Sequence, residues 1–449
     1  MSKQKLIVIG GDAAGMSAAS KIRREHPDRE IIVFERQNHT SYAACGIPYF
    51  IAGQVSSAEN LVAREPEVFR KKQHIDVRTQ QEVTEIDTGN HRVRVTDLSN
   101  RKTYWEEWDT LLIATGASPI VPDVEGMDAE GIFALSTLQS GINTFRYMQA
   151  ERPKKAVIVG GGYIGIEMAE ALLERNMQVS LIDMAPQLMT TLDEDMAGPI
   201  ADYMRDKGIA VFLGEKLSHF EKDREGKIKA VVTDKQTLEA DLVILGMGVK
   251  PNSKLAAGDG IRLGAADAVG VNKKLETSHP GIWAAGDCAD SFHILKKQQV
   301  FIPLGTTANK HGMVAGINIS GGNTEFPGVL GTAITKFLDL EISRTGLSEK
   351  EAKKMGITYR SNTIESPTFS GYYPGTGKMA VKLLVEEKTG RLLGGQITGK
   401  VAAAKRIDTI VAAISAGMTA KDIVDLDLSY APPFSPVWDP VQTAARTLL

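Results

Sequence analysis

Near its start the chain reads Leu6-Ile7-Val8-Ile9-Gly10-Gly11-Asp12-Ala13-Ala14-Gly15, and this run sets the architecture of the protein. A short apolar strand enters a glycine turn and a helix, and a second apolar strand, 31–34, ends in Glu35. In such a βαβ unit the amides of the turn approach a pyrophosphate at the helix N-terminus, and the terminal acid accepts from ribose hydroxyls. The pattern predicts a dinucleotide site that uses Gly10, Asp12, Ala14, Gly15 and Glu35. Asp12 replaces the middle glycine of the G-x-G-x-x-G fingerprint, which leaves a chance match in a glycine-rich loop as the alternative.

A second copy of the pattern argues against a chance match. Strand 157–159 leads to Gly160-Gly161-Gly162-Tyr163-Ile164-Gly165, a full fingerprint, and strand 179–182 ends in Asp183. We expect Gly160, Gly162, Gly165 and Asp183 to bind a second dinucleotide, so that one nucleotide feeds electrons to the other. The following residues, 184–187, contain no Arg or Lys, which favours a free 2′-hydroxyl and therefore NADH over NADPH.

Strand patterns fill the rest of both halves. Alternating residues between Val77 and Trp108 predict a small antiparallel layer, which a strand ending in Ala114-Thr115-Gly116 follows. The second half repeats this order with strands near 230–233 and 241–246. Further on, a strand delivers Gly286-Asp287 to a helix start, where a carboxylate suits a ribityl hydroxyl.

The most distinctive short stretch is Ser41-Tyr42-Ala43-Ala44-Cys45-Gly46-Ile47-Pro48-Tyr49, which holds one of only two cysteines. A thiol at the start of a helix that points into a flavin site would have its thiolate favoured by the helix dipole and would act as a redox nucleophile. The alternative is a small apolar residue that fills a gap. For Cys288, next to Gly286-Asp287, we expect packing rather than chemistry.

Composition narrows the class of protein. The 449 residues carry a net charge of −3 and 43% apolar residues, which is ordinary for a globular chain of two or three domains. We expect no nucleic-acid partner, no membrane attachment and no metal, and the absence of a secretion signal in the sequence predicts a cytoplasmic protein.

Together these strings, with Gly248-x-x-Pro251-Asn252, resemble the single-cysteine branch of the pyridine nucleotide-disulfide oxidoreductases. Dithiol members have a second cysteine five residues after the first, where this chain has Phe50. The Cys45 string is similar to those of coenzyme A (CoA) disulfide reductases, persulfide reductases, NADH oxidases and NADH peroxidases.

The resemblance implies an α/β fold with two Rossmann-like domains, as in glutathione reductase, and a C-terminal α+β dimerisation domain. The implied boundaries are 1–116 with 251–325 for FAD, 117–250 for NAD(P)H, and 326–449 for dimerisation. It also implies that Ser41, Thr115, Gly116 and Asp287 contact FAD, while Tyr163 and Glu167 attend the nicotinamide.

Two tyrosine motifs in the C-terminal segment, Gly371-Tyr372-Tyr373-Pro374-Gly375 and Tyr430-Ala431-Pro432-Pro433, are similar to those of CoA disulfide and persulfide reductases. In that family such tyrosines approach the cysteine of the other subunit of a homodimer. The resemblance therefore implies catalytic roles for Tyr372 and Tyr430, with Tyr373 as the neighbouring alternative.

A lone cysteine needs a redox partner outside the chain, and a CoA thiol supplies one. The anionic nucleotide end of CoA requires cations, and we expect Arg24 to be the foremost of them. The candidates are Lys21, Arg24, Arg64, Arg70, Lys71, Lys72 and Lys310. Their alternative role is a solvated helix face.

The predicted function is FAD-dependent, NAD(P)H-driven reduction of CoA disulfide, CoA persulfide or polysulfide through Cys45, with CoA as substrate or as a covalent adduct of Cys45. The nearest alternative is an NADH oxidase or peroxidase in which Cys45 cycles through a sulfenic acid. A redox sensor or a ferredoxin-type electron carrier is a further alternative, which leaves the cysteine and tyrosine motifs without a purpose.

Overall fold

The computed structural model describes residues 4–449, which separate into two compact units. The first unit contains the chain up to Ile120 together with Leu135–Arg146 and Gly248–Val329. The second unit contains Val121–Ala134, Tyr147–Met247 and Leu330–Leu449.

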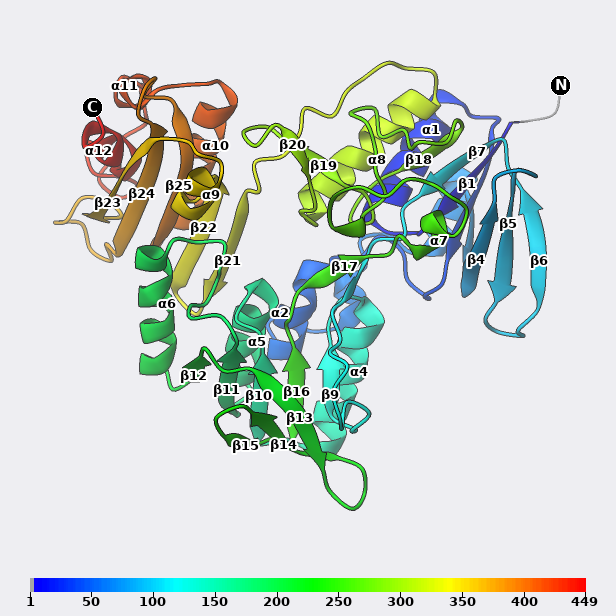
Figure 1. The fold of residues 1–449 in the computed structure, drawn as a ribbon, viewed down its shortest axis with the longest axis horizontal. Helices are drawn as coiled ribbons and strands as arrows, with labels where there is room; N and C mark the ends of the chain where they lie inside the picture. Colours follow the sequence, from blue (N-terminus) through cyan, green and yellow to red (C-terminus); the bar gives the residue numbers. More distant parts are fainter. Residues whose placement is uncertain (1–3) are drawn as a thin grey trace. The chain divides into compact units, whose positions relative to one another are not determined.

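The first unit is built around a parallel sheet with strand order β18-β7-β1-β2-β3. Its central strands are runs of Val, Ile and Leu that are buried on both faces, as parallel sheets require. Helices α1 and α8 pack against each other beside this sheet (Figure 1). The strands are β1 (Lys5–Ile9), β2 (Glu30–Glu35), β3 (Asp76–Thr79), β7 (Thr110–Ile113) and β18 (Ile282–Ala284), and the helices are α1 (Ala13–Glu25) and α8 (Gly305–Ile319).

The antiparallel layer predicted between Val77 and Trp108 is present, but it begins later. Residues Asp76–Thr79 form β3 and pair with β2 in the parallel sheet, because Val77 is buried in the core of that sheet. The layer itself consists of β4 (Gln81–Asp87), β5 (Arg92–Asp97) and β6 (Thr103–Glu107).

Short elements complete the first unit. The pair β8–β17 is antiparallel and brings the segment after Gly116 next to the segment that ends in Pro251. The remaining elements are α2 (Ile47–Ala52), α3 (Pro66–Gln73), β8 (Ala117–Pro119), β17 (Val249–Pro251), α7 (Lys254–Ala257), β19 (Ser291–His293), β20 (Gln298–Val300) and the start of α4 (Leu138–Glu151).

The second unit repeats the parallel arrangement with strand order β12-β11-β10-β16-β9 and adds a small antiparallel layer, β13-β14-β15. The bounds are β9 (Ile132–Ala134), β10 (Lys155–Val159), α5 (Tyr163–Glu174), β11 (Gln178–Asp183), α6 (Glu194–Asp206), β12 (Ala210–Leu213), β13 (Leu217–Lys222), β14 (Ile228–Thr233), β15 (Thr237–Glu239) and β16 (Leu242–Leu245).

The C-terminal part of this unit is an antiparallel sheet of order β21-β22-β25-β24-β23, against which α10 and α12 pack (Figure 1). The bounds are β21 (Ala333–Phe337), β22 (Leu340–Gly346), α9 (Glu349–Lys354), β23 (Tyr359–Pro367), β24 (Lys378–Glu386), β25 (Leu392–Lys400), α10 (Ile407–Ser415), α11 (Ala420–Val424) and α12 (Pro440–Arg446). Two Rossmann-like sheets and a C-terminal α+β region confirm the predicted fold class.

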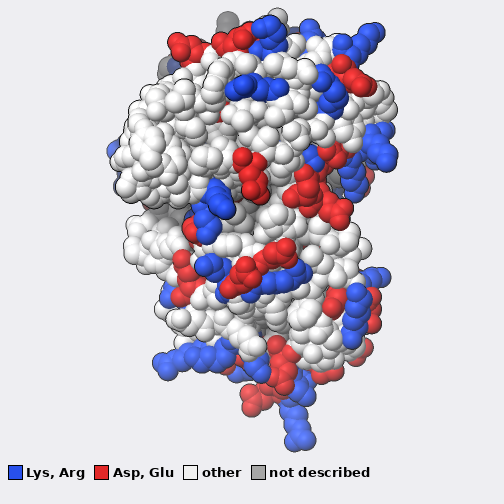
Figure 2. All heavy atoms as spheres, turned by 90° about the vertical axis from the view of Figure 1, so that its left-hand side faces the viewer, with Lys and Arg blue, Asp and Glu red and all other residues white. Residues whose placement is uncertain are grey.

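Within residues 4–449, no helix combines the length and the apolar character that a membrane span needs. On the face shown in Figure 2, acidic and basic side chains are interspersed and neither sign forms a continuous patch, in keeping with the net charge of −3.

Candidate functional site

The first glycine turn has the tight backbone that a pyrophosphate site needs. Gly10 has a φ of +111°, and a Cβ there would lie 2.1 Å from the carbonyl oxygen of Ala114. A Cβ at Gly15 would lie 2.0 Å from the carbonyl oxygen of Gly10. The turn therefore excludes side chains at both positions and leads directly into α1, a geometry that fits the pyrophosphate of a dinucleotide.

Two acids organise the two glycine turns in the same way. Glu35 accepts from the amides of Gly11 at 2.8 Å and Gln37 at 2.7 Å. Asp183 accepts from the amides of Gly161 at 2.6 Å and Ala185 at 2.7 Å. Each carboxylate keeps further lone pairs for a ribose hydroxyl, and each one also fixes the turn that would hold the pyrophosphate.

Asp12, the departure from the fingerprint, has a role of its own in the structure. Its carboxylate accepts from the amide of Tyr42 at 3.1 Å, and the neighbouring carbonyl of Gly11 accepts from the amide of Ser41 at 3.1 Å. Burial raises the pKa of Asp12 to about 7, and the nearby carboxylates of Glu35 and Asp287 add to this shift. The residue thus ties the glycine turn to the segment that leads to Cys45.

Cys45 is exposed and lies in a short 3-10 turn, Ala44–Gly46, directly before α2. The predicted helix start is therefore correct in place, but α2 has only six residues, so its dipole is weaker than a long helix would supply. The backbone of Ser41 is left-handed, with a φ of +46°, and the amide of Ala43 donates to the carbonyl of Leu61 at 2.8 Å. These contacts fix the segment on both sides of the turn.

Other predicted flavin contacts converge in the first unit. Thr115 Oγ1 donates to the carbonyl of Asn252 at 2.6 Å, and the Asn252 side chain donates back to the carbonyl of Thr115 at 2.8 Å. Gly116 has a φ of +69°, and its carbonyl accepts from the amide of Asn252 at 2.9 Å. Burial raises the pKa of Asp287 to about 6, and Ala14 packs against Gly286, where a Cβ would lie 2.8 Å from its methyl group.

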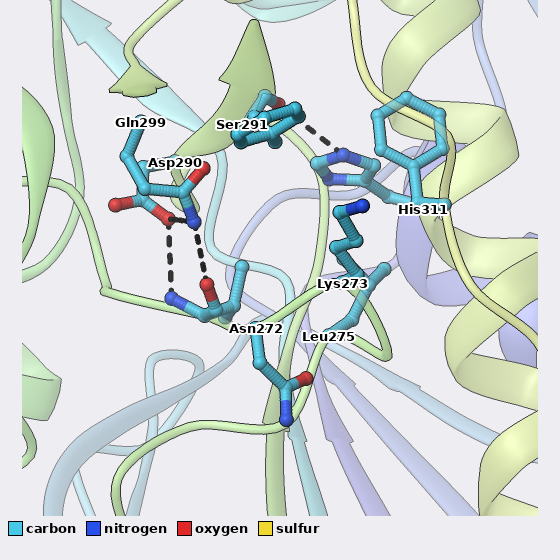
Figure 3. A pocket seen from close by; sticks show the side chains of 10 residues that line it. Asn272, Lys273, Leu275, Asp290, Ser291, Gln299 and His311 are labelled. Atoms are coloured by element: carbon cyan, nitrogen blue, oxygen red, sulfur yellow. Dashed lines mark hydrogen bonds between the residues drawn. The ribbon is translucent and has the colours of Figure 1, made fainter. Parts of the chain in front are cut away.

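His311 was not predicted from the sequence, yet it contacts this turn. It is fully buried on α8, its Nδ1 accepts from the amide of Gly286 at 3.4 Å, and its Nε2 lies 3.3 Å from Ser291 Oγ (Figure 3). Burial lowers the pKa of His311 to about 4. The cavity beside it measures about 10 Å³, which is too small for an organic ligand.

Cys288 is fully buried, with Sγ 3.4 Å from the carbonyl oxygens of Ile113 and Ala285, as a packing role requires. Burial raises the pKa of its thiol.

The second glycine turn repeats the geometry of the first. Gly160 has a φ of +111°, and a Cβ at Gly165 would lie 1.9 Å from the carbonyl oxygen of Gly160. Nothing lies within 4 Å of a Cβ at Gly162, which precedes α5 and leaves space for a ligand. Tyr163 and Glu167 lie one turn apart on α5, and burial raises the pKa of both side chains. Glu167 also accepts from Thr335 Oγ1 on β21 at 2.8 Å.

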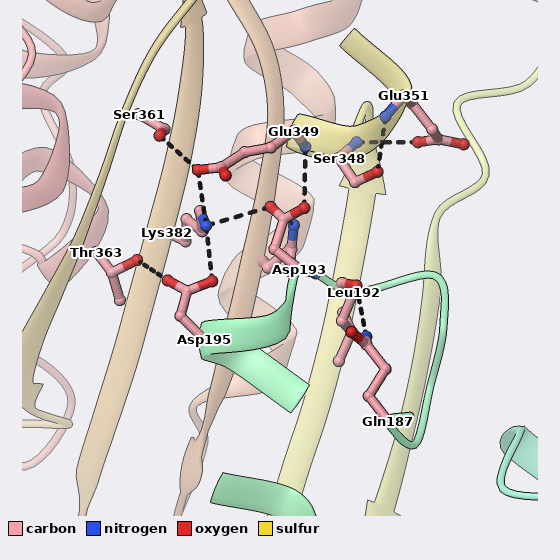
Figure 4. A network of polar contacts seen from close by, with 11 residues as sticks. Gln187, Leu192, Asp193, Asp195, Ser348, Glu349, Glu351, Ser361, Thr363 and Lys382 are labelled. Carbon is pink, nitrogen blue, oxygen red and sulfur yellow. Dashed lines mark hydrogen bonds and ion pairs between the residues drawn. The ribbon is translucent and has the colours of Figure 1, made fainter. Parts of the chain in front are cut away.

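The loop after Asp183 ends in a network around Lys382 of β24 (Figure 4). Lys382 Nζ lies 2.7 Å from Asp195, 2.8 Å from Glu349 and 3.3 Å from Asp193, and its side chain is only 7% exposed. Gln396 of β25 exchanges two hydrogen bonds with Asp193, of 2.8 and 2.6 Å. This network connects the N-terminus of α6 to the C-terminal sheet.

The two tyrosine motifs lie on adjacent loops, which we call the first tyrosine loop (residues 368–377) and the second tyrosine loop (residues 429–439). The amide of Ser370 donates to the carbonyl of Pro432 at 3.2 Å. Tyr372 is 77% exposed, Tyr373 39% and Tyr430 45%. On the second tyrosine loop, Phe434, Val437 and Trp438 are also exposed, so this loop presents large apolar side chains to solvent.

The predicted CoA-binding cations all lie in the first unit, in two groups. Lys21 and Arg24 are on α1, and Lys310 is on the adjoining α8. Lys21 pairs with Glu25 at 2.6 Å, Lys71 pairs with Glu67 at 3.0 Å, and Arg64 lies over the ring of Phe69. Arg24 and Lys310 are exposed.

Comparisons of the sequence and of the structure with known proteins point to one family. The pyridine nucleotide-disulphide oxidoreductase family matches residues 4–312, and its dimerisation domain matches residues 332–440. The chain is 43% identical over 449 residues to the CoA-dependent NAD(P)H sulfur oxidoreductase of Pyrococcus furiosus, covering 100% of both chains. It is similar to the solved NAD-dependent persulfide reductase from A. fulgidus, with a TM-score of 0.96 and 38% identity over 99% of this chain and 82% of that one. An NADH oxidase of Methanocaldococcus jannaschii is 35% identical over 99% of this chain and 98% of its own.

Proposed function

The chain belongs to the pyridine nucleotide-disulphide oxidoreductase family, and from this membership we propose that it uses NAD(P)H to reduce CoA disulfide or CoA persulfide through Cys45. The family uses FAD and NAD(P)H as cofactors. Residues such as Gly10, Gly15, Glu35 and Asp287 would hold FAD, which would supply the relay of two electrons from NAD(P)H to sulfur. The relatives named as CoA-dependent or persulfide-reducing enzymes support the choice of a CoA sulfur substrate.

The observation that carries this proposal is the exposed Cys45 on a segment that is hydrogen-bonded to the first glycine turn. Phe50 occupies the position of a second redox cysteine, so the redox partner of Cys45 has to come from outside the chain, and we propose that it is a CoA thiol. Ser41 and Asp12 lie at the contact between this segment and the first glycine turn, where we propose that the flavin nucleotide binds.

In the proposed reaction the Cys45 thiolate attacks one sulfur of CoA disulfide. A bond forms between Cys45 and one CoA, and the other CoA leaves as a thiolate that takes a proton from Tyr430. Two electrons from NAD(P)H then split the mixed disulfide, which releases the second CoA thiol and restores the Cys45 thiolate. One NADH and one proton are consumed for each disulfide, and two CoA thiols are formed.

We place the anionic nucleotide of CoA among Lys21, Arg24, Arg64, Lys71 and Lys310. Arg24 is the foremost of these, since it is exposed and lies in the last turn of α1. We also propose a homodimer, because a dimerisation domain is present and the tyrosine loops expose large apolar side chains. Asp183, with no cation in residues 184–187, supports NADH as the preferred donor.

Two variants test the role of Cys45. Cys45→Ser should retain flavin and slow oxygen consumption but lose CoA disulfide reduction, because only the thiolate can form the mixed disulfide. Cys288→Ala is the matched control and should retain turnover, since Cys288 is buried. Turnover of CoA disulfide by Cys45→Ser would disprove the proposal.

The similarity to an NADH oxidase supports a second candidate, in which Cys45 cycles through a sulfenic acid. The mass of the intact, unreduced protein separates the two. An increase equal to one CoA on Cys45 supports the disulfide reductase, and an increase of one or more oxygens supports the oxidase.

A further inference from the structure

Arg406 lies between the two tyrosine loops and contacts both. It ends the short 3-10 turn before α10, and its side chain is 12% exposed. One guanidinium nitrogen, Nη2, donates to the carbonyl of Thr368 at 2.6 Å and to the carbonyl of Phe434 at 2.7 Å. Thr368 begins the first tyrosine loop and Phe434 belongs to the second, so the two hydrogens of a single nitrogen serve the two loops.

The other donors of Arg406 fix its own position. Nε donates to Asp439 at 3.1 Å, and Nη1 donates to the carbonyl of Ala402 at 2.5 Å. Asp439 in turn caps α12 by accepting from the amide of Val441 at 2.9 Å. The guanidinium is therefore held at the end of a helix and a turn, and a planar group with this set of donors is specific to arginine.

Other hydrogen bonds also hold the two loops in place. The first tyrosine loop closes through the Thr368 amide, which donates to the carbonyl of Gly377 at 2.9 Å. Ser370 donates from its amide to Pro432 at 3.2 Å and from its hydroxyl to Ser435 at 3.5 Å, which are long bonds. The shorter bonds of Arg406 are thus the stronger part of the link between the loops.

We infer that Arg406 is a positioning residue that sets Tyr372 and Tyr430 relative to each other for proton donation to the leaving CoA thiolate. The inference rests on the proposed function, because it assumes that these tyrosines act on the substrate. Arg406 donates to a backbone carbonyl of each loop, so in this role it acts through the backbone of the two loops.

A double-mutant cycle of Arg406→Gln and Tyr430→Phe, with CoA disulfide as substrate, tests this inference. Arg406→Gln should lower kcat/KM for CoA disulfide roughly 10- to 100-fold, the size expected when a reacting group is misplaced. The double variant should be no slower than the slower single variant, because both changes remove the same proton donor. The rate of flavin reduction by NADH should stay at the wild-type value in all variants.

Two further variants make the test independent of folding. Arg406→Lys keeps the charge but lacks the separate Nε and Nη1 donors that hold the guanidinium to Asp439 and Ala402, so it should be impaired as well, and it replaces Arg406→Gln if the latter does not retain flavin. Arg360→Gln is the matched control, because Arg360 donates to the carbonyl of Leu449 at 3.3 Å, outside both loops.

The outcomes separate the two claims. Wild-type turnover by the Arg406 variants, or defects that multiply in the double variant, overturns the positioning role while the proposed function stands. Wild-type turnover by both Tyr430→Phe and Tyr372→Phe shows that the tyrosine roles in the proposed function fail, and the inference falls with them.

Discussion

Replacing Asp12 by Asn should stabilise the flavin-free protein at alkaline pH and leave it unchanged in acid. Burial raises the pKa of Asp12 from 3.8 to about 7. The folded protein therefore keeps a proton that the unfolded chain releases, and the free energy of unfolding falls as pH rises from about 4 to about 7. A shift of this size lowers the free energy of unfolding by at most about 4 kcal/mol, and this full decrease is reached above pH 7.

The amide group that replaces the carboxylate is uncharged, but its oxygen can still accept from the amide of Tyr42. The Asp12→Asn variant thus removes the penalty for burying a charge and retains the hydrogen bond that holds the cysteine segment. We expect a urea midpoint above that of wild type at about pH 8, and a gap that closes toward about pH 4. The assay is urea unfolding of flavin-free protein, followed by tryptophan fluorescence across this range.

Asp97→Asn is the control, because the pKa of Asp97 is shifted in the direction opposite to that of Asp12. The hydrogen bonds from Ser99 lower the pKa of Asp97, which lies on the surface, so losing this carboxylate should not stabilise the protein at any pH. An Asp12→Asn gap that is the same at acid and alkaline pH would refute the reasoning, because the burial of a charge could then not be its cause. Flavin affinity gives a second readout: it should weaken with rising pH in wild type, as an ionised Asp12 faces an anionic pyrophosphate, but not in the variant.

The second glycine turn, the buried histidine and the Lys382 network give three other predictions. Gly162→Ala should raise the KM for NADH without lowering the melting temperature, because the added Cβ meets no protein atom within 4 Å. Gly165→Ala should instead destabilise the protein by about 2–4 kcal/mol, because its Cβ would lie 1.9 Å from a carbonyl oxygen. His311→Gln should resist acid unfolding better than wild type. Because the pKa of His311 is lowered to about 4, protonation favours the unfolded chain, and the wild-type protein loses stability as pH falls from 6.5 toward 4. Melting temperatures measured against pH will show this difference. Lys382→Met should raise the Kd for NADH more than Lys421→Met, since Lys382 anchors the loop after Asp183 and Lys421 pairs with Asp425 on the surface; equal Kd values for the two variants contradict this prediction.

The sequence predicted those parts of the site whose signals are local. Both glycine turns and their terminal acids follow from strand, turn and helix patterns of about 25 residues. The partner of Asp12 could not be predicted in this way, because it is a backbone amide that reaches the carboxylate only through the left-handed conformation of Ser41. The replacement of the middle fingerprint glycine by Asp12 was the sequence feature that could have indicated a separate role for this residue.

Arg406 and Lys382 were missed for a related reason. Two of the partners of Arg406 are carbonyl groups in two loops that are far apart in the sequence, and a carbonyl carries no sequence signature. The three carboxylates around Lys382 come from the start of α6 and from α9, which meet β24 only through tertiary packing. His311 could have been noticed as a histidine on a small-residue face of α8, but its contact with Gly286 depends on how α8 packs.

The Lys382 network also bears on attempts to redesign coenzyme preference. The loop that begins after Asp183 is pinned at both ends, by the acid itself at one end and by Asp193 in the network at the other. Residues 184–187 are exposed or half-buried and can therefore be exchanged as a cassette for sequences that recognise a 2′-phosphate, whereas Leu188, Met189 and Leu192 are buried and have to be retained. A graft that extends past Asp193 would detach the cassette from the C-terminal sheet, and its new cations would then act from an unanchored loop.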